Sequence, residues 1–103
     1  MLPMKMHKKE RPLDRYINQW HNRLCKRIIE LRLKQKRPRV DVAVGANLNP
    51  NYYGRIERGI TGYMRMSTLI KIKQSLGVKW VDILGPKDPM LAFLDEKEYE
   101  DES

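Results

Sequence analysis

Six apolar side chains in the first third of the chain recur at intervals of four, three, four, four and three residues: Leu13, Ile17, Trp20, Leu24, Ile28 and Leu31. This rhythm places them on one face of an α-helix. Pro12 suits the first turn of such a helix, and Asp14 lies near its positively polarised end. The residue before a proline is disfavoured in helices, so Pro38 limits how far this one can run. The pattern therefore predicts one long helix from about Pro12 to Gln35.

The length and composition of the chain leave room for one small domain. The chain has 103 residues, of which 41% are hydrophobic and 8% aromatic, so it can bury one modest core and cannot be a multi-domain enzyme. Cys25 is the single cysteine, so no intramolecular disulfide can form, and we expect a reducing, cytoplasmic location. The sequence contains neither a signal peptide nor an apolar run of membrane-spanning length, which predicts a soluble protein.

The charge of the chain is strongly uneven. The formal net charge is +8, with 13 basic and 3 acidic side chains in residues 1–40, 6 and 3 in residues 41–84, and 2 and 7 in residues 85–103. Such a field suits a polyanion, for which nucleic acid is the commonest candidate. An acidic membrane surface is the alternative. It requires a free apolar helix face, and we expect these faces to be used in the core, so no membrane partner is expected.

The second half of the chain has the end signals of several shorter helices. Residues 39–46 have β-propensity, but no other segment could pair with them as a strand. Asn47 tolerates a left-handed turn, and Asn49-Pro50 is a favourable start for a helix that ends at Gly59. Further helices are predicted over Thr68 to Leu76 and Trp80 to Leu84, each followed by a glycine, and Asp88-Pro89 can open a final turn.

A helix, a turn of about four residues ending in an N-cap, and a second helix ended by a glycine form the pattern of a helix-turn-helix. Residues 24–84 resemble the Xre/Cro family of repressors, the lambda-repressor-like DNA-binding domains. The resemblance rests on KRIIELR in the first helix, Ala43 and Leu48 around the turn, the RIERG signature, and STLIKIKQSLGV followed by WVDIL. It implies a compact all-α fold of four to five helices, here with an extended N-terminal helix.

The resemblance also divides the chain into three parts. Residues 1–23 are a basic extension mostly continuous with the first helix, and residues 24–84 are the helix-turn-helix DNA-binding domain. Residues 85–103 contain a short apolar segment and an acidic tail that we expect to be disordered. The apolar residues of the last part, Met90, Leu91, Phe93 and Leu94, exceed what a four-helix core requires, so they are a candidate surface for self-association or a protein partner.

The family resemblance assigns roles to particular residues of this chain. Arg32 and Glu57 occupy the positions of a structural ion pair; breaking it would cost about 3–5 kcal/mol if the pair is buried, whereas a surface pair would contribute less than about 1 kcal/mol. The base-facing positions of the reading helix are Pro50, Asn51, Tyr52 and Arg55. Asn51 can bond adenine and Arg55 guanine, while Tyr52 can contact a thymine methyl group or a phosphate. The alternatives are a capping role for Asn51 and a core role for Tyr52.

Phosphate contacts are expected from six side chains: Lys36, Arg37, Arg39, Arg58, Tyr63 and Arg65. Arg39 stands where the family usually has glutamine, at the start of the scanning helix. Pro38 replaces the usual serine cap, so that helix lacks a side-chain cap. Ala46 is smaller than the usual leucine, which leaves space for Tyr52 or Tyr53.

Other function classes find less support. No set of catalytic groups or cofactor motif can be assembled, so no enzyme and no cofactor are expected. His21 and Cys25 share a helix face, but zinc usually takes four ligands, so we expect no metal site and interpret the pair as a buried thiol beside a surface imidazole. The segment Gly59-Ile60-Thr61-Gly62 resembles the clamp of KH domains, an RNA-binding fold that needs a sheet.

The sequence thus predicts a DNA-binding transcriptional regulator that reads double-stranded DNA through the major groove. We expect a homodimer, because one reading helix specifies few base pairs, and a repressor that occludes a promoter. The alternative is a helix-turn-helix module that works mainly through protein contacts, such as an antitoxin whose tail or N-terminal helix holds a toxin.

Overall fold

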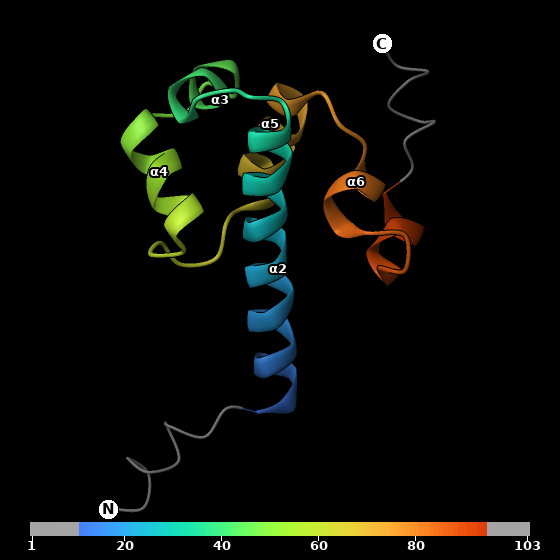
Figure 1. Ribbon diagram of the computed structural model, residues 1–103. Helices are drawn as coiled ribbons and strands as arrows, with labels where there is room; N and C mark the ends of the chain where they lie inside the picture. Colours follow the sequence, from blue (N-terminus) through green and yellow to red (C-terminus); the bar gives the residue numbers. More distant parts are fainter. Residues whose placement is uncertain (1–10, 95–103) are drawn as a thin grey trace, which may run out of the picture.

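The computed structural model describes residues 11–94. Five α-helices and one 3₁₀ helix follow one another in this part of the chain: α2 (Pro12–Lys34), α3 (Arg39–Gly45), α4 (Pro50–Arg58), α5 (Met66–Leu76), α6 (Trp80–Leu84) and η1 (Pro89–Phe93) (Figure 1). Residues 11–94 contain no strand. The expected fold class, an all-α domain of four to five helices with an extended N-terminal helix, is confirmed. The predicted disorder of the acidic tail concerns residues 95–103, outside the described part.

The ends of the short helices follow from local side-chain chemistry. Asn49 caps α4, since its Oδ1 accepts hydrogen bonds from the backbone N–H groups of Asn51 and Tyr52 at 2.8 and 3.3 Å. Gly59 ends α4 with a left-handed φ of 69°, and Gly77 ends α5 with a φ of 66°. The predicted start of α5 at Thr68 is wrong by two residues, because the chain turns helical at Met66 without any side-chain cap.

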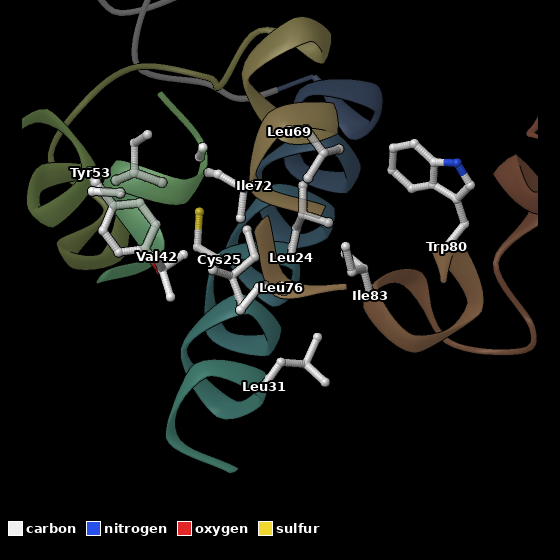
Figure 2. Close-up of a cluster of buried hydrophobic side chains, with 14 residues drawn as sticks. Leu24, Cys25, Leu31, Val42, Tyr53, Leu69, Ile72, Leu76, Trp80 and Ile83 are labelled. Carbon is white, nitrogen blue, oxygen red and sulfur yellow. The ribbon is translucent and has the colours of Figure 1, made fainter. Parts of the chain in front are cut away.

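All five α-helices contribute side chains to one hydrophobic core. Ile28 of α2, Val42 of α3 and Ile72 of α5 are fully buried. Tyr53 of α4 and Trp80 of α6 are the largest buried side chains and are 0% and 1% exposed. In Figure 2, Tyr53 lies toward one side of the core and Trp80 toward the other, with residues of α2 and α5 between them. The core therefore joins α4 indirectly to the C-terminal helices.

The N-terminal turns of α2 extend beyond the rest of the domain (Figure 1). Leu13 is 64% exposed, which corrects the expectation that the whole apolar stripe faces the core. Ile17 and Trp20 are half-buried, and full burial begins with the next turn of the helix. The stripe correctly identifies one helix face, but its first turn, at Leu13, is left open to solvent.

Trp20 joins α2 to the segment around η1. Its indole Nε1–H donates a hydrogen bond to the Asp88 carboxylate at 2.7 Å. The other oxygen of Asp88 accepts from the backbone N–H of Met90 at 2.8 Å, which caps η1. The expected final turn at Asp88-Pro89 therefore exists. No helix within residues 11–94 is both long enough and apolar enough to cross a membrane.

Candidate nucleic-acid interface

The candidate interface is built on α3, a four-residue turn and α4. Asn47 adopts a left-handed φ of 57° in this turn, as its residue type allows. The backbone N–H of Leu48 donates to the carbonyl of Ala43 at 2.8 Å and so fixes the turn to the end of α3. Pro38 precedes α3 without any side-chain cap, as expected. Because Asn49 caps the next helix, α4 begins in a defined place relative to α3.

A buried ion pair joins α4 to α2. Arg32 donates two hydrogen bonds to the Glu57 carboxylate, from Nε to Oε2 at 2.6 Å and from Nη2 to Oε1 at 3.1 Å. The side chains of Arg32 and Glu57 are only 9% and 1% exposed. Nη1 of Arg32 also donates to the carbonyl of Arg37 at 2.9 Å. The ion pair expected between Arg32 and Glu57 therefore forms. It is buried, and the guanidinium binds the carboxylate in a bidentate way.

Arg39 adds a second guanidinium to the same carboxylate. Its Nε donates to Oε1 of Glu57 at 2.9 Å, although the Arg39 side chain is 54% exposed. The contact holds the guanidinium at the start of α3 beside α4 while about half of the side chain stays open to solvent. Burial disfavours the charge of Glu57, but hydrogen bonds from Arg32 and Arg39 outweigh this cost and hold its pKa below the ordinary value.

The residues expected to face bases do not all share one environment. Pro50, Asn51 and Arg55 are exposed. Asn51 and Arg55 are four residues apart in α4, so they lie on the same outward face. Tyr52 is half-buried and packs against the core, which fits the core alternative better than full exposure to a groove. Tyr53 is the tyrosine that is fully buried in α4, and Ala46 beside the turn is also buried.

The side chains expected to contact phosphate also differ in their surroundings. Four of them are exposed basic residues: Lys36, Arg39, Arg58 and Arg65. Tyr63 is 58% exposed, and its hydroxyl donates to Oδ1 of Asn18 in α2. Arg37 is engaged within the domain, since it donates to Asp41 Oδ2 at 2.6 Å and to the carbonyl of Ser75 at 2.5 Å. These bonds give Arg37 a role in joining α3 to α5.

Gly54 lies in α4 between Asn51 and Arg55, two of the residues expected to face bases. It is buried, and a Cβ added there would lie 3.3 Å from Nη1 of Arg58. The end of the Arg58 side chain therefore covers the space that a larger residue would occupy. The guanidinium at the end of this long side chain can move away, so Arg58 can make room for a Cβ at Gly54.

His21 of α2 holds the segment that follows α4. Its Nε2 accepts a hydrogen bond from the backbone N–H of Met64 at 3.0 Å, and the edge of its ring contacts Tyr63 with ring centroids 5.2 Å apart. The imidazole is 9% exposed, which corrects the interpretation of a surface histidine beside Cys25. Loop residues cover it, and their position could not be inferred from α2 alone. Burial lowers the pKa of His21 below its ordinary value of 6.5.

Several structural contacts had no counterpart among the sequence predictions. Arg27 donates to the carbonyl of Asp82 at 2.6 Å, and Gln35 donates to the carbonyl of Leu76 at 2.7 Å. The Trp20–Asp88 bond belongs to the same group. Each joins residues at least 41 positions apart, and in two of the three the acceptor is a backbone carbonyl, which leaves no trace in the side-chain pattern. The spacing of residues along the chain therefore gave no signal for them.

Gly59-Ile60-Thr61-Gly62 forms the end of α4 and the loop behind it, and the described residues contain no sheet on which a KH clamp could be built. The backbone N–H of Ile60 donates to the carbonyl of Arg55 at 3.1 Å, as in a glycine-terminated helix.

Comparison of the chain with family models, curated proteins and solved structures returns no match.

Proposed function

We propose that this protein is a cytoplasmic, sequence-specific DNA-binding regulator similar to the Xre/Cro repressors. In this proposal α4 enters the major groove of double-stranded DNA, and α3 lies across the backbone. The observation that carries the proposal is the pairing of an exposed polar face with a rigid support. Asn51 and Arg55 point away from the domain on one face of α4, while Glu57 on the opposite face is fastened to α2.

The chemistry of the two exposed side chains suits base edges. An asparagine amide can bond N6 and N7 of adenine, and an arginine fork can bond O6 and N7 of guanine. Because Glu57 is neutralised inside the domain by Arg32 and Arg39, its charge does not oppose a phosphate backbone approaching α4. Arg58 belongs to α4 and Arg39 is bound to Glu57 of α4, so both bring exposed positive charge to this helix, and Lys36 and Arg65 are further exposed candidates. Tyr52 and Pro50 would contribute shape.

A single helix of this size can specify only a few base pairs. Two copies of α4 on neighbouring half-sites would provide useful specificity, so we propose that the regulator acts as a homodimer. A dimer bound across a promoter would exclude the transcription machinery, which favours repression as the outcome.

Selection of bound sequences from a random pool of DNA duplexes tests the proposal directly. We expect one sequence motif with two related half-sites to be enriched. On the selected site, Arg55→Ala should weaken binding by about 1–3 kcal/mol and relax the preference at one base position in each half-site. Failure to enrich any sequence, with protein shown to be folded by circular dichroism, would contradict the proposed function.

Arg39→Ala separates backbone contact from base reading. It should weaken binding to the selected site and to random DNA about equally, because a phosphate contact carries no sequence information and Arg32 still holds Glu57 in place. Arg23→Ala is the matched control, since it removes the same charge from an exposed position of α2 near Asp88 rather than near α4. A changed base preference in Arg39→Ala, or an unchanged one in Arg55→Ala, would show that α4 is oriented differently.

A further inference from the structure

Arg58 is the last residue of α4, and its side chain folds back along the helix. A Cβ added at Gly54 would lie 3.3 Å from Nη1 and 3.9 Å from Cζ of Arg58. These distances place the guanidinium over Gly54, one helical turn before the residue that carries it. Helical side chains point toward the N-terminus, and the glycine lets the guanidinium lie close to the helix backbone. The charge of Arg58 is therefore presented in the middle of α4 instead of at its C-terminal end.

The outward face of α4 includes Arg58 as well as two residues expected to face bases. With about 3.6 residues per turn, Arg55 lies about 40° around the helix axis from Asn51 in one direction, and Arg58 about 20° in the other. All three are exposed, whereas Tyr53 and Ile56 on the opposite side of the helix are buried. The face that would enter a major groove thus carries one arginine on each side of its asparagine.

The donors of the Arg58 guanidinium are available for a ligand. Among residues 11–94 it has no hydrogen-bond or ion-pair partner, whereas Arg39 donates to Glu57. The end of α4 does not require it either, because the backbone N–H groups of the next two residues bond carbonyls of α4 at 3.0 and 3.1 Å. A planar guanidinium with unused donors can bind O6 and N7 of guanine in a bidentate way.

We propose that Arg58 reads a guanine base, in place of the phosphate contact expected from the sequence, and that Gly54 is its positioning residue. The proposal rests on the proposed DNA-binding function and deepens it: each half-site contains one guanine for Arg55 and a second one for Arg58. Gly54 has this role because a side chain there would occupy the place of the guanidinium.

Competition binding tests the proposal on the DNA site selected with the parent chain, with each base position varied in turn. Arg58→Ala should reduce the preference for guanine at one position at least about fivefold, the lower end of what a bidentate contact contributes. This position should differ from the one that Arg55→Ala relaxes. Arg65→Ala is the matched control, because it removes the same side chain from an exposed position before α5. It should change no base preference.

Gly54→Ala tests the positioning role, since it keeps both arginines. Its Cβ requires the Arg58 guanidinium to shift, so the preference at the Arg58 position should fall at least about twofold, while the preference at the Arg55 position is kept. In the Arg58→Ala background, Gly54→Ala should change this preference no further, because the group that it displaces is absent. A glycine that serves only the fold would not produce this dependence on Arg58.

Two results would overturn the proposal. One is an Arg58→Ala protein that binds every sequence more weakly by the same factor, which is the behaviour of a phosphate contact. The other is a guanine preference that Gly54→Ala leaves unchanged. Thermal unfolding shows whether each variant is folded, and we expect the parent melting temperature for Arg58→Ala because this side chain is exposed.

The selection experiment separates this proposal from the DNA-binding function on which it rests. A parent chain that enriches no sequence refutes the function and the role of Arg58 with it. An enriched motif whose base preferences all survive Arg58→Ala refutes the role of Arg58 alone.

Discussion

Glu57 is the residue on which three helices depend. Its carboxylate is 1% exposed in α4 and accepts hydrogen bonds from Arg32 of α2 and Arg39 of α3. A buried ion pair adds little net stability compared with apolar residues, since both charges lose their water. The value of the arrangement is therefore geometric: it sets the orientation of α4, and the loss of Arg32 leaves the buried carboxylate with only the half-exposed Arg39 as its partner.

Arg32→Met should lower the free energy of unfolding by about 3–5 kcal/mol, because Glu57 then remains charged in a buried site. The double variant Arg32→Met/Glu57→Leu should lose much less than the sum of the two single variants, since neither buried charge remains. Urea denaturation at neutral pH measures all three. A loss below about 1 kcal/mol for Arg32→Met would indicate that the pair behaves like one on the surface.

His21 gives the domain a pH-dependent contact. Its pKa is lowered by burial, so the folded protein binds fewer protons than the unfolded chain as the pH falls below 6.5. Stability should therefore be fully present above about pH 6.5 and should fall as the pH is lowered toward the folded pKa. The protonated ring would also lose the acceptor that Nε2 presents to the N–H of Met64.

We expect the free energy of unfolding, measured by urea titration, to fall between pH 7 and pH 5 in the parent chain. His21→Gln retains an acceptor and does not titrate, so its stability should be nearly constant over this interval. The lowered pKa of Glu57 affects stability only at lower pH, from its ordinary 4.5 downward. Equal slopes for the parent chain and His21→Gln would assign the pH dependence to other groups.

At the scale of whole elements, the approach of α3 to α5 depends on a glycine. A Cβ at Gly45 would lie 2.5 Å from Oγ of Ser75. That hydroxyl donates to the carbonyl of Val42 at 2.8 Å, so it cannot turn away without losing a hydrogen bond between the two helices. Gly54 in α4 offers the contrast, because only the movable end of Arg58 lies above it.

Alanine at these two glycines should have opposite effects. Gly45→Ala should lower the free energy of unfolding by about 1 kcal/mol, because leaving the Val42 carbonyl without Ser75 costs about 1–3 kcal/mol, more than the up to about 1 kcal/mol that alanine gains in a helix. Gly54→Ala should raise it by about 0.5–1 kcal/mol, because alanine loses less backbone entropy in a helix. Thermal unfolding of the two variants in parallel measures the difference. Destabilisation by Gly54→Ala would mean that Arg58 is held in place more firmly than an exposed side chain should be.

Across the whole molecule, positive charge gathers in the first 40 residues and negative charge at the C-terminal end. If several basic groups neutralise phosphates, each releases counterions, and the affinity for DNA depends steeply on salt. Raising the salt from about 50 to about 200 mM should weaken binding by at least tenfold. Fluorescence anisotropy with a labelled duplex measures this dependence. An affinity that does not change with salt concentration would argue against the phosphate contacts.

The sequence alone determined the starts of α2 and α4 and the ends of α4 and α5, but not the start of α5. Proline at the first position of α2 and α4, asparagine at the cap of α4 and glycine after α4 and α5 act on backbone groups within a few residues of themselves. For that reason the order of elements could be predicted, whereas the outward positions of α4 came from the family resemblance. Arg32 and Glu57 could be paired because a family resemblance supplied the distant partner.

Only the tertiary structure decided which surfaces meet. The burial of His21 under the loop near Met64, the contact between Arg39 and Glu57, and the hydrogen bond between Trp20 and Asp88 join segments that are far apart in the chain. An apolar stripe identifies the face of a helix, yet it does not say how many of its turns find a neighbour. The sequence therefore predicts Leu13 as a core residue, but it is exposed in the fold, where the N-terminal end of α2 extends beyond the other helices.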